Sequence, residues 1–361
     1  STLTNKGIVV ANSNSSDGSN STFSGVNDVA ISPTYDMFVT DANNNRVMKR
    51  AIGASSGTVA AGFNGNGTQP NQLAYPNGVE LVNNNLYILS SSANSVVKWK
   101  LGDLKGQRVA GSKGWGIAAD ELYYPRKTFV DAQGNSYVAD ANNYRVQKFA
   151  PNSKVGTTVA GGNGDGWNLN QINSSLSDIL VDGSGNIFAA RGWPTWDVVK
   201  WVPGATQGIV VAGGNGGGSG LNQFSDNAKI SMDVNGNLYI LDVNNFRVLK
   251  WTPGASQGTL VAGGNGYGNA PNQISYSNGI SVNSSGTLIY IADSNNHRIQ
   301  RWNTGGIEGV TVAGGNGYGN AANQLSYPSS VCLDANNNLI ITDSNNYRVQ
   351  KWINGSTSEI G

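Results

Sequence analysis

A ten-residue unit recurs seven times along this chain at a spacing of about fifty residues. Its last copy reads Asp-Ser-Asn-Asn-Tyr-Arg-Val-Gln-Lys-Trp over residues 343–352, and the earlier copies begin at residues 41, 90, 140, 192, 242 and 293. A period of this length is typical of stacked repeats or propeller blades, in which each repeat buries its apolar face against its neighbours. The repeats span the whole chain, so we expect a single domain over residues 1–361.

Each unit predicts the end of one strand, a tight turn and a second strand. In five copies an acid at the turn entrance is followed five residues later by an arginine, a spacing that allows a bidentate ion pair across the turn. Catalytic pairs do not recur five times in one chain, so we interpret these pairs as structural. They are Asp41/Arg46, Asp140/Arg145, Asp242/Arg247, Asp293/Arg298 and Asp343/Arg348.

Four strand candidates lie in each repeat, and in the sixth they are residues 258–262, 279–282, 288–292 and 298–302. Clusters of Asp, Asn and Gly such as residues 233–236 are interpreted as hairpin turns. A calcium loop would need a bidentate Glu at its twelfth position, which these clusters lack. Seven repeats of four short strands, without helical periodicity, predict an all-β fold, a seven-bladed β-propeller of four-stranded antiparallel blades.

The two ends of the chain complement each other. The last repeat ends after residue 352 without the Thr-Val-Ala-Gly-Gly strand of its siblings, while residues 6–11 match residues 207–212. We therefore expect residues 7–11 to form the outer strand of the seventh blade, which removes an open sheet edge.

The repeat resembles the NHL repeat over essentially residues 7–353. The resemblance is carried by an apolar strand, an Asp/Gly turn, the core Asp-x-Asn-Asn-x-Arg-Val/Ile-x-Lys-Trp and the following Thr-Val-Ala-Gly-Gly. Familiar NHL propellers mostly have six blades and a shorter repeat, whereas this chain has seven repeats, with the extra length in a loop such as residues 263–274. Kelch repeats share the longer period, but their paired glycines and Tyr/Trp spacing are missing.

The long loops are the most variable part of the repeat. The position of Tyr267 is occupied by Ser16, Asn66, Trp115, Asp165, Gly217 and Tyr318 in the other loops. Variation beside a repeated framework is typical of a binding surface, although drift in exposed loops produces it as well. In a propeller these loops and the central hairpin turns emerge on one face, which is therefore the predicted binding face.

Two repeats depart from the acid/arginine pattern. Ser90 and Ser95 replace the pair in the second, and Arg191-Gly-Trp-Pro-Thr-Trp-Asp197 replaces it in the fourth. The two tryptophans there could stack on a sugar or on a partner's side chain, or they could seal a rebuilt turn. The candidate binding residues are Trp115, Trp167, Trp193, Trp196, Tyr267 and Tyr318.

Composition narrows the possible partners. Charged residues make up only 12% of the chain and the net charge is +1, so no basic excess is available for nucleic acid. No apolar run approaches the roughly 20 residues of a membrane span. A single cysteine, Cys332, allows no disulfide within the chain. Low charge also means little repulsion between copies, so we expect a protein or glycan partner and allow for a homo-oligomer or filament.

The resemblance raises the question of catalysis. NHL relatives include a zinc-dependent peptide-amidating lyase, and related six-bladed propellers hydrolyse esters with a central calcium. Such a lyase needs several histidines, but this chain has only His297, in a position where sibling repeats carry Tyr or Phe. No Ser/His/Asp set is evident. We predict a non-catalytic protein without cofactor or metal; the alternative is a metal-dependent hydrolase or lyase with a central-channel site.

The chain begins with Ser, which fits removal of a signal peptide and equally fits trimming, and we expect an extracellular protein. Sequons for N-glycosylation occur no more often than chance predicts. They lie at Asn14, Asn20, Asn66, Asn173, Asn283 and Asn354. The function predicted from the sequence is that of a secreted scaffold that binds protein or glycan through its loop face.

Overall fold

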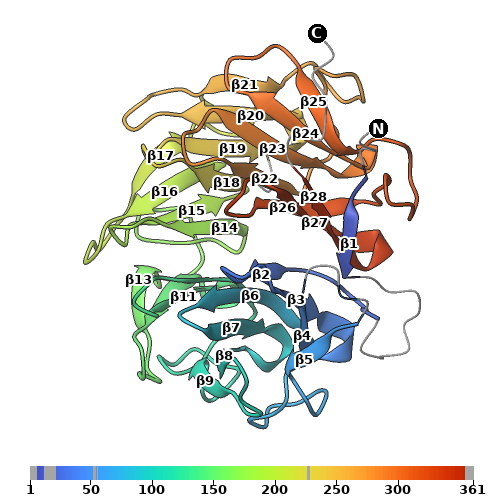
Figure 1. Cartoon of the computed structure of the whole chain (residues 1–361). Helices are drawn as coiled ribbons and strands as arrows, with labels where there is room; N and C mark the ends of the chain where they lie inside the picture. Colours follow the sequence, from blue (N-terminus) through green and yellow to red (C-terminus); the bar gives the residue numbers. More distant parts are fainter. Residues whose placement is uncertain (1–5, 12–21, 52–53, 55, 226–227, 354–361) are drawn as a thin grey trace. The chain divides into compact units, whose positions relative to one another are not determined.

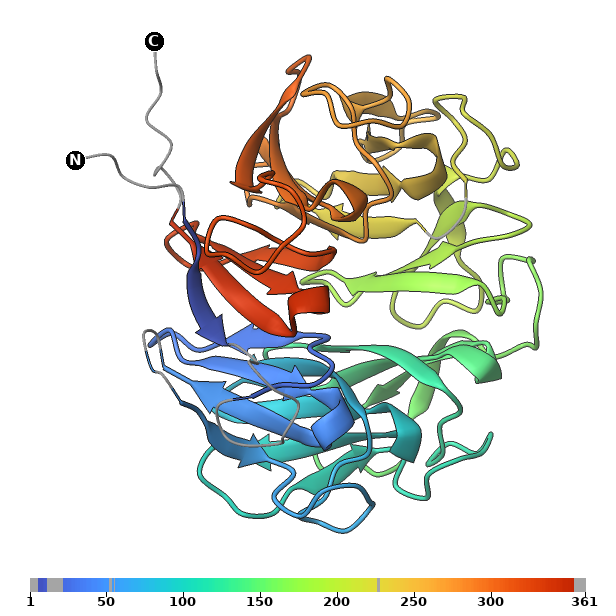
Figure 2. The ribbon, with the colours of Figure 1, turned by 90° about the vertical axis from the view of Figure 1, so that its right-hand side faces the viewer.

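The structure is a computed structural model that describes residues 6–11, 22–51, 54, 56–225 and 228–353. These residues form seven four-stranded antiparallel sheets (Figures 1 and 2). The protein is therefore a seven-bladed β-propeller, which confirms the predicted fold class. Of the predicted site positions, Asn14, Ser16, Asn20 and Asn354 lie outside the described residues.

The chain divides into two compact units. One comprises Asn14–Pro194 and Val198–Val210; the other comprises Ser1–Ser13, Thr195–Asp197 and Val211–Gly361. The first three sheets belong to the former unit and the last three to the latter. The expectation of a single domain stays a prediction.

The first four sheets follow the chain in order, from an inner to an outer strand. Their strands are β2 (Val29–Ile31), β3 (Met37–Asp41), β4 (Arg46–Arg50) and β5 (Thr58–Ala61); β6 (Pro76–Val82), β7 (Asn85–Ser90), β8 (Ser95–Lys100) and β9 (Gln107–Ala110); β10 (Pro125–Val130), β11 (Ser136–Asp140), β12 (Arg145–Phe149) and β13 (Thr157–Gly161); and β14 (Leu176–Val181), β15 (Ile187–Arg191), β16 (Asp197–Trp201) and β17 (Ile209–Gly213).

The remaining sheets repeat this plan. Their strands are β18 (Lys229–Met232), β19 (Leu238–Asp242), β20 (Arg247–Trp251) and β21 (Thr259–Gly263); β22 (Gly279–Val282), β23 (Leu288–Asp293), β24 (Arg298–Asn303) and β25 (Gly309–Gly314); and β26 (Pro328–Leu333), β27 (Leu339–Asp343), β28 (Arg348–Trp352) and β1 (Ile8–Ala11). In the seventh sheet β1 pairs antiparallel with β28, so residues from the start of the chain supply the outer strand, as predicted.

A short 3-10 helix connects the second and third strands of six sheets. These are η1 (Ala42–Asn44), η2 (Ser91–Ala93), η3 (Ala141–Asn143), η4 (Val243–Asn245), η5 (Ser294–Asn296) and η6 (Ser344–Asn346). The residue after each helix adopts a left-handed backbone, for example Asn45 with φ 55° and His297 with φ 52°. This reversal places the acid and the arginine of the repeat opposite each other, as Asp293 and Arg298 are in the ladder between β23 and β24.

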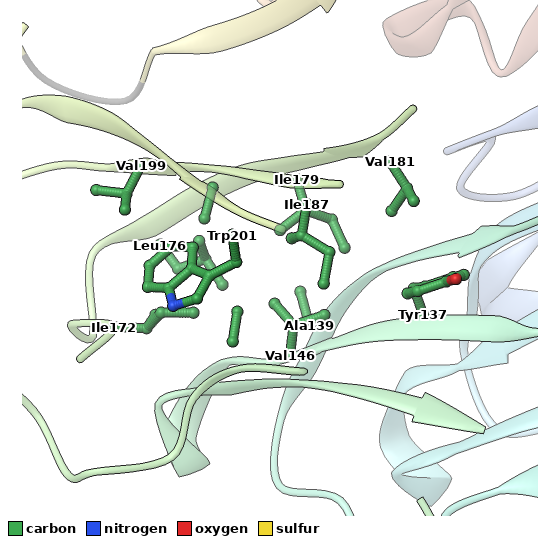
Figure 3. Packing of buried hydrophobic residues seen from close by; sticks show 12 residues of the cluster. Tyr137, Ala139, Val146, Ile172, Leu176, Ile179, Val181, Ile187, Val199 and Trp201 are labelled. Carbon is green, nitrogen blue, oxygen red and sulfur yellow. The ribbon is translucent and has the colours of Figure 1, made fainter. Parts of the chain in front are cut away.

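Apolar side chains from neighbouring sheets form the core. In the cluster drawn in Figure 3, Trp201 of β16 is 1% exposed and packs with Ile172 and Leu176, while Ala139 and Val146 come from the preceding sheet. The tryptophans Trp99, Trp302 and Trp352 occupy the same strand position and are as deeply buried. The recurrent tryptophan therefore packs between neighbouring sheets and belongs to the core.

Candidate binding face and inner-strand cluster

The acid/arginine pairs bind the long loops to the sheets. In the sixth sheet Arg298 Nε donates to Asp293 Oδ2 at 2.8 Å, and the pair is buried. The other guanidinium nitrogens donate to the backbone oxygens of Asn269, Ala270 and Gln273 at 2.8, 3.3 and 3.0 Å. The carboxylate thus receives one arginine bond rather than the expected two, because the remaining donors are used by the loop.

Two further groups complete this arrangement. Asn296 Nδ2 donates both to Asp293 Oδ2 and to Gly268 O, each at 2.8 Å. The backbone N–H of Ser275, which follows the loop, donates to Asp293 Oδ1 at 2.8 Å. We call the buried acid, its arginine and the loop oxygens that the arginine binds the loop clamp. Arg46, Arg145, Arg247 and Arg348 also donate to their acids, at 2.6–2.8 Å.

The fourth repeat keeps the loop bonds in a different way. Arg191 stands at the position of the acid, and its guanidinium donates to Asn168 O and Gln171 O, both at 3.0 Å. The second repeat has no such arginine. Ser90 Oγ accepts the backbone N–H of Ala74 at 2.8 Å, as the carboxylate does elsewhere, but Ser95 offers nothing that reaches the loop.

The long loops also carry their own internal bonds. In the loop from Gly263 to Ile274, Gln273 Nε2 donates to Asn265 O at 2.9 Å and Asn265 Nδ2 donates to Asn272 O at 3.0 Å. Tyr267 and Ile274 form a β-bridge, and the Ile274 side chain is fully buried. A loop that is bonded internally and anchored at its end presents its outward side chains in a fixed arrangement.

Aromatic side chains gather where a turn meets a long loop. Phe246, which follows η4, contacts Tyr267 and Tyr276 edge to face, with ring centroids 5.4 and 5.3 Å apart. The two tyrosine rings are 6.0 Å from each other, and about half of each tyrosine remains exposed. This trio, the first aromatic cluster, contains the predicted binding residue Tyr267.

His297 occupies the equivalent position one repeat later. Its ring contacts Tyr327 at 4.7 Å and Tyr318 at 5.5 Å, and Nδ1 accepts the backbone N–H of Tyr327 at 3.3 Å. Burial lowers the pKa of His297, so the neutral ring that accepts this bond is favoured. His297 is half-buried in this second aromatic cluster. The cluster contains the predicted binding residue Tyr318.

The other predicted aromatic residues are placed singly or in pairs. Trp115 is 67% exposed and meets Tyr123 edge to face at 5.5 Å. Trp167 and Trp193 are also exposed. Trp196 is half-buried, and its indole lies so close to Gly217 that a Cβ there would come within 3.1 Å of it. Trp196 therefore packs on a loop glycine, which favours the turn-sealing alternative for this residue.

The sequons differ in accessibility. Asn66 is exposed. Asn173 is buried, and its Nδ2 donates to Trp193 O at 3.1 Å, so a glycan at this nitrogen would break a buried bond. Asn283 uses its side chain within a hairpin turn, where Oδ1 accepts the backbone N–H groups of Thr287 and Leu288. Of the sequons described, Asn66 is the best placed to carry a glycan.

Sequence reasoning missed a charged cluster on or directly before the first strands of the first four sheets. Asp28 Oδ2 accepts the backbone N–H of Val79 at 2.9 Å, and Glu80 Oε2 accepts that of Val130 at 2.9 Å. Lys127 forms an ion pair with Asp178. We call Asp28, Glu80, Lys127 and Asp178 the inner-strand cluster. Each member lies in the repeat after that of the previous member. This spacing of about fifty residues was the only feature of the sequence that could have indicated the cluster.

Burial dominates the electrostatics of this cluster. Loss of water raises the pKa of Glu80 to about 8 and that of Asp28 to about 6, against the lowering effect of the backbone N–H bonds. Burial disfavours the charged form of Lys127, but Asp178, Asp28 and Glu80 together hold its pKa above the usual value. Near neutral pH, Glu80 is therefore largely a neutral acid beside a charged ion pair.

The described residues contain no group of three or more His, Cys, Asp or Glu side chains arranged to hold a metal ion. Within the same residues no helix is long and apolar enough to cross a membrane.

Comparison with known proteins agrees with this architecture. The NHL repeat model matches residues 278–302 and 325–352, which cover most of β22–β24 and β26–β28. The model matches two of the seven repeats, and together with the seven four-stranded sheets these matches support an NHL-repeat β-propeller. A comparison with curated proteins gave no match.

Solved structures with the same fold differ widely in sequence. Virginiamycin B lyase from Staphylococcus aureus superposes with a TM-score of 0.60 at 10% identity, over 91% of this chain and 94% of that one. YCF48 bound to D1 peptide gives 0.63 at 11% identity, over 93% and 95%. Hydrazine synthase from Kuenenia stuttgartiensis gives 0.60 at 10% identity, over 92% and 96%. At this identity the likeness extends to the fold alone.

Proposed function

We propose that this protein is a non-catalytic, secreted propeller scaffold that binds a protein or glycan partner through its long loops. The observation that carries this proposal is the pair of aromatic clusters at Tyr267 and Tyr318. Their tyrosine rings lie outside the core and are supported edge to face by Phe246 and His297, so they are held in place and yet about half exposed. Rigid aromatic rings offer contact area at low entropic cost.

The chemistry around the clusters supports an uncharged contact surface. The loop side chains Asn265 and Gln273 use their amides within the loop, and the chain carries a net charge of only +1. A scaffold of this composition has little repulsion between copies, which supports self-association as a further part of the proposal. The exposed sequon at Asn66 is compatible with the proposed secretion.

The test is binding of purified protein to a panel of immobilised neutral oligosaccharides and peptides. We expect retention on at least one class, lost in the double variant Tyr267→Ala/Tyr318→Ala. The matched control is Tyr347→Asn, because Tyr347 is 46% exposed but has no aromatic partner in the described residues. Retention that survives the double variant, or no retention at all, would overturn the proposal. Light scattering over a wide concentration range tests self-association.

A second candidate function, a hydrolase or lyase acting at the inner strands, is favoured by one observation. Glu80, with a pKa raised to about 8, is a neutral acid next to the Lys127/Asp178 ion pair, and such a group can donate a proton near neutral pH. Turnover of a chromogenic ester or glycoside that is abolished by Glu80→Gln would favour this enzyme over the non-catalytic scaffold.

A further inference from the structure

The second repeat contains a cavity where its siblings contain an arginine. The cavity has a volume of about 300 Å³, at the lower end of the range of small-molecule sites. It is lined by the long loop from Gly62 to Leu73, by Ser90 and Ser95 of the second sheet, and by Arg108 of β9. Lys154, from the turn between β12 and β13, completes the lining.

The sibling loop clamp explains why this cavity exists. In the sixth sheet Arg298 fills the corresponding space and donates to Asn269 O, Ala270 O and Gln273 O. Alignment of the two loops on their Asn-Gln pairs makes Thr68, Gln69 and Gln72 the equivalents of these acceptors, and all three line the cavity. Replacing the acid and the arginine with two serines removes the side chains that fill the space but keeps the oxygens they serve.

The polar groups of the cavity are only partly satisfied. Arg108 Nη2 donates to Thr68 O at 3.2 Å, and Gln69 O accepts the backbone N–H of Gln72 at 2.9 Å. Gln72 O receives no donor from the described residues. Ser95 is fully buried, and its hydroxyl lacks a hydrogen-bond partner. Buried groups of this kind are normally paired, so the site has unmet capacity for a ligand with hydroxyl donors.

Charge decides what kind of ligand fits. The lining includes two cationic side chains, Arg108 and Lys154, and no carboxylate. A ligand with a guanidinium or ammonium group would therefore be repelled here. The sibling repeats can hold an arginine in the same space because a buried acid accompanies it. Burial lowers the pKa of Arg108, because it disfavours the cationic form of the guanidinium. An anionic group beside Arg108 offsets this cost.

We propose that the cavity of the second repeat binds an acidic monosaccharide, that is, a single sugar ring that carries a carboxylate. Its carboxylate would face Arg108 and Lys154, and its hydroxyl groups would donate to backbone oxygens such as Gln72 O. This site is separate from the two aromatic clusters, so the inference does not depend on the proposed function. It adds a ligand class that neither the repeat family nor the fold assigns.

The test is calorimetric titration of the full chain with sodium glucuronate, with glucose as the neutral isostere and a short Glu-rich peptide as the alternative anion. We expect glucuronate to bind to the wild-type protein and glucose to bind at least about tenfold more weakly. One charged hydrogen bond accounts for a difference of this size in the dissociation constant. A peptide that binds more tightly than glucuronate would overturn the assignment to a sugar.

Two variants locate the site. Ser90→Asp/Ser95→Arg rebuilds the sibling loop clamp inside the cavity and should abolish binding while the protein stays folded, since five of the seven repeats carry this acid/arginine pair. Lys154→Gln changes only an exposed turn residue and should weaken binding about tenfold. Glucuronate binding that is unchanged in the double variant, or absent from the wild-type protein, would overturn the proposal. Tyr267→Ala/Tyr318→Ala should leave it intact, which separates this site from the aromatic clusters.

Discussion

The loops from Gly263 to Ile274 and from Gly62 to Leu73 have the same length, and each contains an equivalent β-bridge and an equivalent backbone bond from its glutamine, but only the first is clamped. Arg298 connects the first loop to a buried acid in the sheet through three loop oxygens. In the second, Ser90 reproduces only the single bond to the backbone N–H after the loop. The internal bonds therefore suffice to form the loop, and the clamp determines whether the space beneath it is filled or open.

The largest effect that tests this comparison is the loss of the clamp arginine. Arg298→Ala leaves the fully buried carboxylate of Asp293 without its cation, and we expect a loss of about 3–5 kcal/mol in the free energy of unfolding, measured by urea denaturation. Ser95→Ala at the same position of the second repeat removes an unpaired hydroxyl and should change stability by less than about 0.5 kcal/mol. Similar losses in the two variants would refute the distinction between the loops.

A smaller effect tests what the loops share. Gly263 has φ 65° and Gly62 has φ 81°, and a Cβ at either would lie 2.3–2.4 Å from a backbone oxygen of the preceding turn. We expect Gly263→Ala and Gly62→Ala to lower the unfolding midpoint equally, because the start of the loop does not involve the clamp. Gly266→Ala and Gly65→Ala are the controls: both have positive φ with nothing within 4 Å, so only the left-handed cost of about 1–2 kcal/mol remains.

The last effect is the change in the free energy of unfolding for each pH unit. It depends on Glu80, which lies in the second sheet. A carboxyl whose pKa is raised by folding binds more protons in the folded state, so its contribution is complete below about 4.5 and is lost as pH rises through about 8. We expect stability to fall over this window by at most about 1.4 kcal/mol per pH unit, and Glu80→Gln to flatten the profile.

The control for the pH profile is Asp120→Asn. Asp120 forms an exposed ion pair with Lys113 that lowers the pKa of its carboxyl, so its effect has the opposite sign and stays small. A wild-type profile without a decline toward pH 8 would contradict the assignment of a neutral acid at Glu80.

Periodicity made the architecture predictable, because a strict repeat of turn residues, acid, arginine and tryptophan leaves few other folds. The same regularity predicted β1 from the missing strand of the last repeat. The inner-strand cluster was not foreseen because Asp28, Glu80, Lys127 and Asp178 each stand alone in their own repeat, and only the arrangement of successive sheets brings them together.

The site was predictable only in part. Tyr267 and Tyr318 stood out by their loop positions, but Phe246 and His297, which support them, resembled ordinary turn residues in the sequence. The exchange of the acid for Arg191 was visible in the sequence, but its role required the bonds from its guanidinium to the loop. The cavity beneath the second loop follows from two serines whose effect depends on the volume they leave empty.

The pairing of β1 with β28 has a mechanical consequence. The strands are antiparallel, and Ile8, at the start of β1, pairs with Lys351, near the end of β28. A force that pulls the two ends of the chain apart therefore acts on one end of the ladder and breaks its hydrogen bonds in succession rather than together. The seventh sheet would peel open at low tension, so the contact that completes the fold is also the one that yields first when the chain is stretched.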